Sequence, residues 1–198
     1  NKYAEYRYFI KYCYAAHKIY ILISFLRLIV KEVFQKDGGC MVQLDTSWLQ
    51  HVQKPARYTG GEYNSIVKDH STVDVTMALA FPDVYEVAMS HLGIKILYGL
   101  INRREDAAAE RVFAPWHDME EEMRKRNIPL FSLETRTPIK NFDVLAFTLQ
   151  YEMSFTNILN MLDLAGIPMY AKDRDMDFPL LVCGGPCAFN VEPIADFF

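Results

Sequence analysis

Mostly apolar runs alternate with amphipathic segments over residues 73–198. The runs over 73–82, 142–149 and 178–183, with a shorter one over 110–115, predict strands that are covered on both faces. Strands that alternate with helices in this way pair in parallel through right-handed crossovers. The pattern predicts an α/β fold, a Rossmann-like open parallel sheet with helices on both faces. Because the alternation stops at Phe198, inside or just after an element, we expect the sheet to be truncated at the C-terminus.

The spacing of apolar residues between these runs predicts the helices. Residues 83–90 are expected to form a turn. Asp118 is the expected N-cap of a helix over 119–126, whose acidic start and basic end suit the helix dipole. Ser154 is expected to start the next helix, and another begins at Val191. The helix that follows the turn is expected to bury a face made of Leu92, Ile96, Leu97, Leu100 and Ile101.

Composition excludes several classes of protein. The formal net charge of −4 and the pI near 5.7 give no basic excess for binding nucleic acid. The four cysteines are too few and too scattered for a disulfide framework, which favours a reducing, cytoplasmic location. The longest apolar run, over 19–30, contains Arg27, and a membrane-spanning helix needs about 20 apolar residues. No signal-peptide cleavage site follows it, so we expect no membrane span.

Residues 1–40 differ from the rest of the chain. They carry a net charge of +4, so residues 41–198 carry −8. Met41 opens a segment typical of a native amino terminus, and Gly38 and Gly39 can be encoded by the purine-rich bases of a bacterial ribosome-binding site. One interpretation is that residues 1–40 are translated upstream DNA. The other is a genuine amphipathic helix that packs on the body or lies on a membrane surface.

Three loops are expected at the carboxyl edge of the sheet, where open parallel sheets bind their ligands. They cover residues 82–93, 148–154 and 184–190, and they combine glycine with polar tips. No residue in them is predicted to be catalytic or to bind a metal. The candidate cofactor-binding residues are Ser90, His91, Leu92, Gly93, Gln150, Tyr151, Gly184, Gly185 and Pro186.

The individual signals in these loops are weak. Gly184 and Gly185 would allow main chain to approach a ligand, or would form a tight strand-to-helix turn. They belong to neither a G-x-G-x-x-G fingerprint nor a Walker loop. Cys183 and Cys187 lack the third cysteine of a radical cluster motif, since Asn190 stands in its place, so Cys183 is interpreted as a buried strand residue.

His91 lies where a cobalamin-ligating histidine would lie, in the loop after the first strand. The pattern for that role is D-x-H-x-x-G, but Met89 and Ile94 stand where the Asp and Gly should be. The carboxylate that would orient the imidazole is therefore missing. A helix-capping or pocket-lining histidine is the favoured interpretation.

Five ordered motifs together point to a family. They cover residues 54–64 (KPARYTGGEYN), 81–93 (FPDVYEVAMSHLG), 110–116 (ERVFAPW), 149–152 (LQYE) and 184–190 (GGPCAFN). The chain resembles the amino-terminal region of a bacterial family of cobalamin-binding-type radical S-adenosylmethionine proteins. The resemblance implies a cobalamin, or a degenerate version of its site, against the three loops. Many relatives in that wider class bind the corrin without a protein axial ligand.

The resemblance also implies a partner and a division of the chain. S-adenosylmethionine and a 4Fe-4S cluster belong to a downstream radical barrel domain, so this chain alone is not expected to be catalytic. The expected parts are an extension (1–40), an arm that packs on the body (41–72) and an incomplete cobalamin-binding-like domain (73–198). Two alternatives stay open, a cofactor-free structural or docking module and an independent small-molecule enzyme of flavodoxin-like fold.

Overall fold

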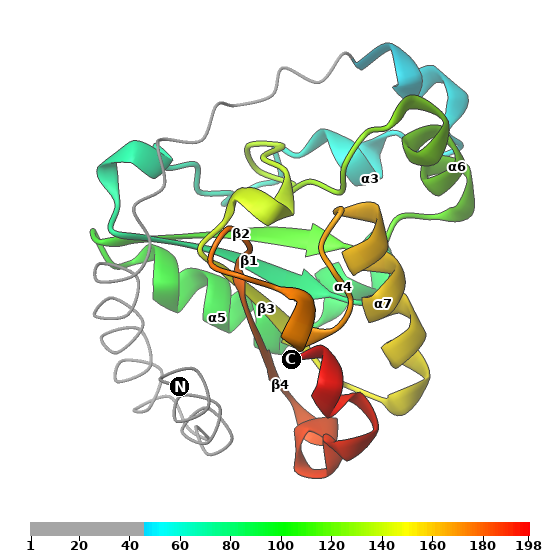
Figure 1. Cartoon of the computed structure of the whole chain (residues 1–198). Helices are drawn as coiled ribbons and strands as arrows, with labels where there is room; N and C mark the ends of the chain where they lie inside the picture. The colour runs from blue at the N-terminus through cyan, green and yellow to red at the C-terminus, as the bar shows by residue number, and fades with distance from the viewer. Residues whose placement is uncertain (1–45) are drawn as a thin grey trace.

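The structure, a computed structural model, describes residues 46–198. The expectations about residues 1–40 and Met41 lie outside the described residues. Four strands form one all-parallel open sheet in the order β2-β1-β3-β4 (Figure 1). The strands are β1 (Val75–Phe81), β2 (Ala107–Phe113), β3 (Val144–Thr148) and β4 (Leu180–Gly184). The predicted α/β class and parallel pairing are confirmed, whereas truncation after β4 stays a prediction.

Helices cover both faces of the sheet. Helix α5 (Leu92–Asn102) packs on one face through Ile94, Tyr98 and Ile101, in a cluster with alternate residues of β1 and β2. Helices α6 (His117–Arg126) and α7 (Phe155–Leu164) pack on the other face, as Figure 1 shows, around Leu145 and Phe147 of β3. Strands β1 and β2 are buried along their whole length because both faces of each strand are covered.

The first crossover differs from its prediction in two ways. The expected turn over 83–90 contains a short helix, α4 (Tyr85–Ser90). The predicted buried face of α5 is right for Ile101 but wrong for Leu92 and Ile96, which are 68% and 51% exposed. Ile94 and Tyr98 are buried in their place. The helix is rotated so that the Tyr98 ring lies 4.6 Å from the Arg111 guanidinium carbon and the Tyr98 hydroxyl bonds the backbone of Ile66.

Three element ends also need correction. Trp116, not Asp118, is the N-cap of α6, and the Asp118 carboxylate instead accepts a hydrogen bond from Gln53 N–H at 2.7 Å. Ser154 occupies the N-cap position of α7, as predicted, although its hydroxyl donates to Tyr151 O at 2.7 Å and makes no capping hydrogen bond. The helix expected from Val191 is a 3₁₀ helix, η7 (Glu192–Phe197), and another 3₁₀ helix, η6 (Pro186–Asn190), lies in the loop before it. Strand β2 begins at Ala107, before the predicted position 110.

The segment before β1 lies against the body of the domain. It contains η1 (Thr46–His51), α3 (Ala56–Thr59) and η2 (His70–Thr72). Trp48 is buried, with its ring centroid 6.3 Å from that of Tyr58 and 6.0 Å from that of Phe131. The remaining short elements are the 3₁₀ helices η3 (Ile139–Asn141), η4 (Glu152–Ser154) and η5 (Ala171–Asp173).

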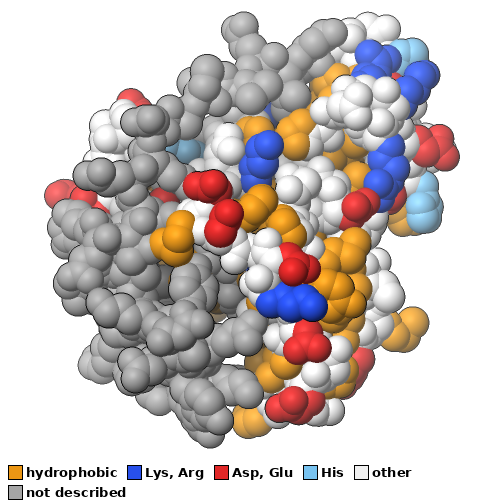
Figure 2. Space-filling view, in the orientation of Figure 1, with side chains coloured by type: hydrophobic (Ala, Val, Ile, Leu, Met, Phe, Trp, Pro, Cys, Tyr) orange, Lys and Arg blue, Asp and Glu red, His pale blue; other side chains and the backbone are white. Residues whose placement is uncertain are grey.

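The surface mixes side chains of all kinds on the face shown in Figure 2, where hydrophobic groups lie among Lys, Arg, Asp and Glu. Among the helices of residues 46–198, none has both the length and the apolar character needed to cross a membrane.

Candidate functional site

A topological switch point lies between the carboxyl ends of β1 and β3, and we call this position the crevice. The chain leaves β1 toward α5 on one face of the sheet, and it leaves β3 toward α7 on the opposite face. Because β1 and β3 are neighbours, the loops that follow them diverge at this point. Open α/β sheets bind ligands at such a switch point, outside the carboxyl ends of the strands. Two of the three predicted loops therefore flank the crevice.

Hydrogen bonds join the loops across the crevice. The Tyr151 hydroxyl donates to Asp83 Oδ2, and this bond raises the pKa of Tyr151 above its ordinary value. The Asn157 amide of α7 donates to Pro82 O at 2.9 Å, and Ala114 N–H donates to Asp83 O at 3.0 Å. Sequence reasoning missed Asp83 and Asn157 as site residues. The available signal for Asp83 was its place directly after Pro82, the proline that ends a buried strand.

The loops after β3 and β4 contact each other through their backbones. Leu149 N–H donates to Gly184 O at 2.6 Å, and Leu149 O accepts from Cys187 N–H at 3.1 Å. Gly185 has a φ of 118°, and a Cβ on it would lie 2.6 Å from Leu149 O. Glycine at position 185 therefore permits the tight turn into Pro186 and η6. A Cβ on Gly184, in contrast, would have no atom within 4 Å. Gly184 leaves open space at this edge.

The four candidate residues from Ser90 to Gly93 form the junction of α4 and α5. The Ser90 hydroxyl donates to Val87 O at 2.7 Å. His91 is the N-cap of α5, where its Nδ1 accepts a hydrogen bond from Ile94 N–H at 3.3 Å. A neutral imidazole whose Nδ1 accepts carries its proton on Nε2. The ring covers Gly93, since a Cβ there would lie 2.7 Å from His91 Cε1, and Leu92 is exposed.

Hydrogen bonds link the candidate residues of the loops after β3 and β4 to one another. Gln150 donates from its side chain to Thr148 Oγ1 beside Tyr151, and the Gly184–Pro186 turn bonds the same loop through Leu149. The side chains of Ser90 and His91 are held by hydrogen bonds to the backbone of α4 and α5, respectively. They follow Asp83 in the predicted loop over 82–93, so the polypeptide itself links them to the crevice.

The two cysteines of this edge are free thiols. Burial raises the pKa of Cys183 to about 11, and burial also raises the pKa of Cys187. A thiol with a raised pKa is a poor metal ligand and a poor nucleophile at neutral pH, because the thiolate is the reactive form. Within residues 46–198, no group of three or more His, Cys, Asp or Glu side chains is placed to hold a metal ion.

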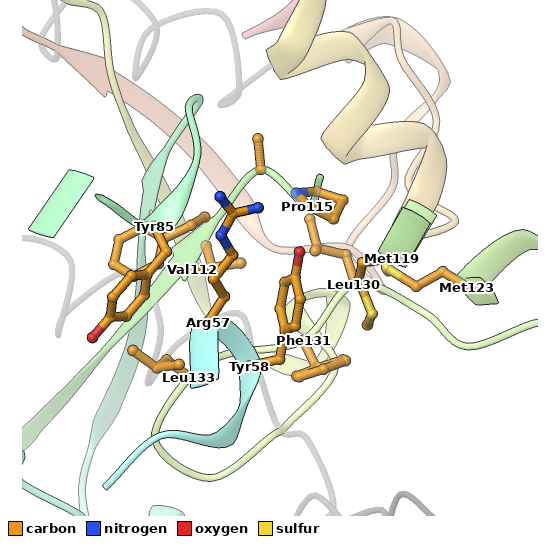
Figure 3. Close-up of a pocket in the computed structure, with 12 residues that line it drawn as sticks. Arg57, Tyr58, Tyr85, Val112, Pro115, Met119, Met123, Leu130, Phe131 and Leu133 are labelled. Carbon is orange, nitrogen blue, oxygen red and sulfur yellow. The ribbon is translucent and has the colours of Figure 1, made fainter. Parts of the chain in front are cut away.

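A small cavity lies at the carboxyl end of β2, between α3 and α6 (Figure 3). Its volume of about 30 Å³ leaves room for one or two water molecules. Arg57 on its wall is ion-paired with Glu86 at 2.9 Å, which lowers the pKa of Glu86 to about 2. None of the nine candidate residues lines this cavity, which is bounded by Arg57, Tyr58, Tyr85, Val112, Phe113, Ala114, Pro115, Met119, Met123, Leu130, Phe131 and Leu133.

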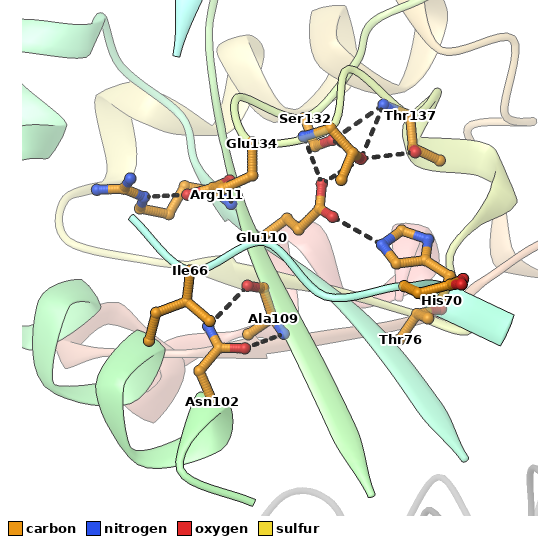
Figure 4. Close-up of polar contacts among 12 residues, drawn as sticks. Ile66, His70, Thr76, Asn102, Ala109, Glu110, Arg111, Ser132, Glu134 and Thr137 are labelled. Atoms are coloured by element: carbon orange, nitrogen blue, oxygen red, sulfur yellow. Dashed lines mark hydrogen bonds and ion pairs between the residues drawn. The ribbon is translucent and has the colours of Figure 1, made fainter. Parts of the chain in front are cut away.

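Strand β2 carries a buried acidic side chain toward the face of α6 and α7 (Figure 4). Glu110 accepts hydrogen bonds from His70 Nε2 and from the Thr135 hydroxyl, both at 2.7 Å. Burial acts to raise the pKa of Glu110, but the hydrogen bonds from His70, Ser132 and Thr135 outweigh it and lower the pKa below its ordinary value. Glu110 therefore ties η2 and the loop at 132–135 to the sheet.

The next residue of β2 carries a buried ion pair. Arg111 Nε lies 2.6 Å from Glu134 Oε1, and Arg111 Nη2 lies 3.4 Å from Glu62 Oε2. Arg111 N–H also donates to Glu134 Oε2, and Leu133 N–H donates to Arg111 O at 2.8 Å. These bonds cover the outer edge of β2, which would otherwise expose unpaired backbone groups. Sequence reasoning treated 110–115 only as a strand and missed this network.

Comparison with known proteins gives two matches. Residues 93–198 match the family described as "Radical SAM proteins, N-terminal". Over 125 residues the chain is 27% identical to an uncharacterized protein of Methanocaldococcus jannaschii. That alignment covers 62% of this chain and 22% of the relative, so the chain spans less than a quarter of the relative's length. No solved structure matches the chain.

Proposed function

Because the chain belongs to the family of N-terminal domains of radical SAM proteins, we propose that it holds a cobalamin at the crevice between β1 and β3 and presents it to a radical SAM domain. The domain is an accessory binding module in this proposal. The reaction with S-adenosylmethionine takes place in the partner domain. The substrate is bound there as well, so this chain supplies no catalytic side chain.

One observation carries the proposal. The loops after β1, β3 and β4 meet at one edge of the sheet, and the first two flank the switch-point crevice. In open parallel sheets this is the place where a ligand reaches the ends of several strands at once.

The side chains at the crevice suit the rim of a corrin, which carries amide groups that both donate and accept hydrogen bonds. Gln150 and Thr148 offer an amide and a hydroxyl, and Gly184 leaves the backbone open beside them. When bound, a cobalamin supplies group-transfer and redox chemistry at its cobalt. His91 does not suit axial ligation, because its Nδ1 is occupied in capping α5 and its proton lies on Nε2. The proposal therefore uses no protein ligand to the cobalt.

The alternative is a cofactor-free docking module of the same multidomain protein. The bond between Tyr151 and Asp83 favours it, because this bond bridges the crevice that a corrin would occupy. Opening that bond is part of the free-energy cost of binding in the cobalamin proposal, and the docking alternative needs no such change.

The test is retention of hydroxocobalamin by the purified chain. The chain is mixed with excess hydroxocobalamin, passed through a desalting column and read by its visible spectrum. We expect about one cobalamin per chain for the wild type and for the control Gly99→Leu. Gly184→Phe fills the open space at the end of β4, beside Thr148 of β3, and is expected to lose the pigment. A colourless wild-type protein would refute cobalamin binding and favour the docking module. Pigment retained by Gly184→Phe would refute this location.

A further inference from the structure

Three of the five ordered sequence motifs meet at the cavity near the carboxyl end of β2. The motifs over 54–64, 81–93 and 110–116 each contribute residues to its wall, which Figure 3 shows. Of these three motifs, only the one over 81–93 reaches the crevice, through Asp83. The other two contact that motif, and one of these contacts is an ion pair made by Arg57.

Two cations of the arm share one carboxylate of α4. Arg57 donates to Glu86 Oε1 from Nε at 3.0 Å and from Nη2 at 2.9 Å, and Lys54 Nζ donates to the same oxygen at 3.1 Å. The Arg57 side chain is 12% exposed, compared with 60% for Lys54. The Arg57 guanidinium carbon also lies 5.3 Å from the centroid of the Trp116 ring. Arg57 is therefore the more buried of the two cations and makes more contacts.

Helix α4 depends on such contacts because it is short. It has six residues, and its N-cap Val84 makes no side-chain capping bond, whereas isolated helices shorter than about 12 residues are marginal in water. Glu86 lies in the first turn of α4, shortly after Asp83 in the chain. The Tyr85 ring packs against that of Phe113 in β2 with centroids 5.7 Å apart, and Glu86 joins the same turn to the arm. The arm therefore holds the end of α4 that follows Asp83.

We infer that Arg57 is a positioning residue for the crevice. Through Glu86 it fixes the first turn of α4, and so it sets where Asp83 lies relative to the Tyr151 hydroxyl on the other side of the crevice. The inference rests on the proposed function for the view of the crevice as a binding site. It adds that Arg57, which lies in the arm, controls how closely the loops after β1 and β3 approach each other.

The Tyr151 hydroxyl reports this approach. Its hydrogen bond to Asp83 raises the pKa of Tyr151 above the ordinary 10.0. The Tyr151 side chain is otherwise in contact with water, so its pKa falls toward 10.0 when Asp83 moves away. NMR titration of the full chain with isotope-labelled tyrosine rings measures this pKa, and Tyr151→Phe assigns the signal among the 12 tyrosines.

Two variants remove the ion pair from either side. We expect the pKa of Tyr151 to fall toward 10.0 in both Arg57→Met and Glu86→Gln. Arg57→Lys keeps a cation beside Glu86 and is expected to restore part of the wild-type shift. The matched control is Arg126→Met, because Arg126 is paired with Glu122 of its own helix α6 at 2.6 Å. The control is expected to keep the wild-type pKa of Tyr151.

Several results would overturn the inference. A merely structural Arg57 would change stability and leave the pKa of Tyr151 unchanged in Arg57→Met and Glu86→Gln. An equal fall in Arg126→Met would show that the effect does not depend on α4. An ordinary pKa in the wild type would show that Asp83 and Tyr151 are not bonded. Circular dichroism verifies that the variants fold, which is expected because partly exposed ion pairs contribute little to stability. The assay contains no cobalamin, so failure of this inference is distinguishable from failure to retain cobalamin.

Discussion

Replacing Arg111 by methionine tests whether the ion pair on β2 holds the edge of the sheet. The Arg111 and Glu134 side chains are 6% and 0% exposed, and their charged atoms lie 2.6 Å apart. Methionine keeps the apolar part of the side chain and removes the charge. The substitution leaves the Glu134 carboxylate buried without the guanidinium, while the backbone N–H of residue 111 still donates to it.

The size of the effect follows from the buried charge that remains. Removing one partner of a buried ion pair costs about 3–5 kcal/mol. Burial raises the pKa of Glu134 even with Arg111 opposing it. Without Arg111 the carboxyl group can therefore take up a proton, which limits the penalty. The lost contact between the guanidinium and the Tyr98 ring adds about 0.5–1 kcal/mol. We expect a loss of about 3 kcal/mol in the free energy of unfolding.

Urea denaturation followed by tryptophan fluorescence measures this loss. The control is Arg124→Met, because the Arg124 ion pair with Asp163 is about half exposed and such pairs contribute about 0–1 kcal/mol. In the Arg111→Met background, Glu134→Gln is expected to cost little, which gives a coupling energy of about 1–3 kcal/mol between the two positions. A loss below about 1 kcal/mol for Arg111→Met, or one no larger than that of Arg124→Met, would refute the reasoning.

Three further predictions concern the crevice and the arm. The pKa of Glu86 is about 2, below its ordinary 4.5. Its ion pair with Arg57 therefore stabilises the fold above about pH 4.5, and this stabilisation is lost as the pH falls toward 2. Glu86→Gln should remove this contribution to the fall in the urea midpoint at acid pH. His91→Ala should cost about 1 kcal/mol in urea denaturation through loss of the α5 cap, and His91→Asn should restore most of it. Gly185→Ala should cost about 1–3 kcal/mol because of its positive φ, whereas Gly184→Ala should stay within about 0.5 kcal/mol; equal effects of the two would contradict the geometry.

The parts of the fold that could be predicted are those with strong local signals. Strands β1, β3 and β4 are continuous apolar runs, and each lies inside its predicted range or within one residue of it. Strand β2 begins with Ala107-Ala108-Ala109, and alanine has little preference for strands. Its start is fixed by pairing with β1, in which Val75 lies opposite Ala107. No local pattern could reveal that contact.

The buried face of α5 was mispredicted for a related reason. Leu92 and Ile96 have a helical spacing with Ile101, which is buried as predicted, but so have Ile94 and Tyr98. The choice between the two faces depends on what the helix packs against. Tyr98 is selected because its ring lies over Arg111 and its hydroxyl reaches Ile66. Both partners are distant in sequence and could not be inferred from the helix alone.

Strand order decides which loops form the candidate site. A parallel sheet places every loop that follows a strand at its carboxyl edge, which the sequence could predict. The parallel arrangement does not tell which of these loops are adjacent. In the order β1-β2-β3-β4, β2 would separate Asp83 from Tyr151 by about 10 Å. In the observed order β2-β1-β3-β4 the two side chains bond directly.

The sequence did contain a signal for that order, in the charged pair Glu110 and Arg111 within a buried strand. A central strand has a strand on each side, and the backbone of its neighbours cannot neutralise two buried charges. An edge strand has a free side, where loops can bring polar side chains to it. Here the loop at 132–135 does so through Glu134 and Thr135. A buried charged pair therefore favours an edge position for β2, where it cannot stand between β1 and β3. In the structure β1 and β3 pair directly, and Asp83 and Tyr151 are neighbours.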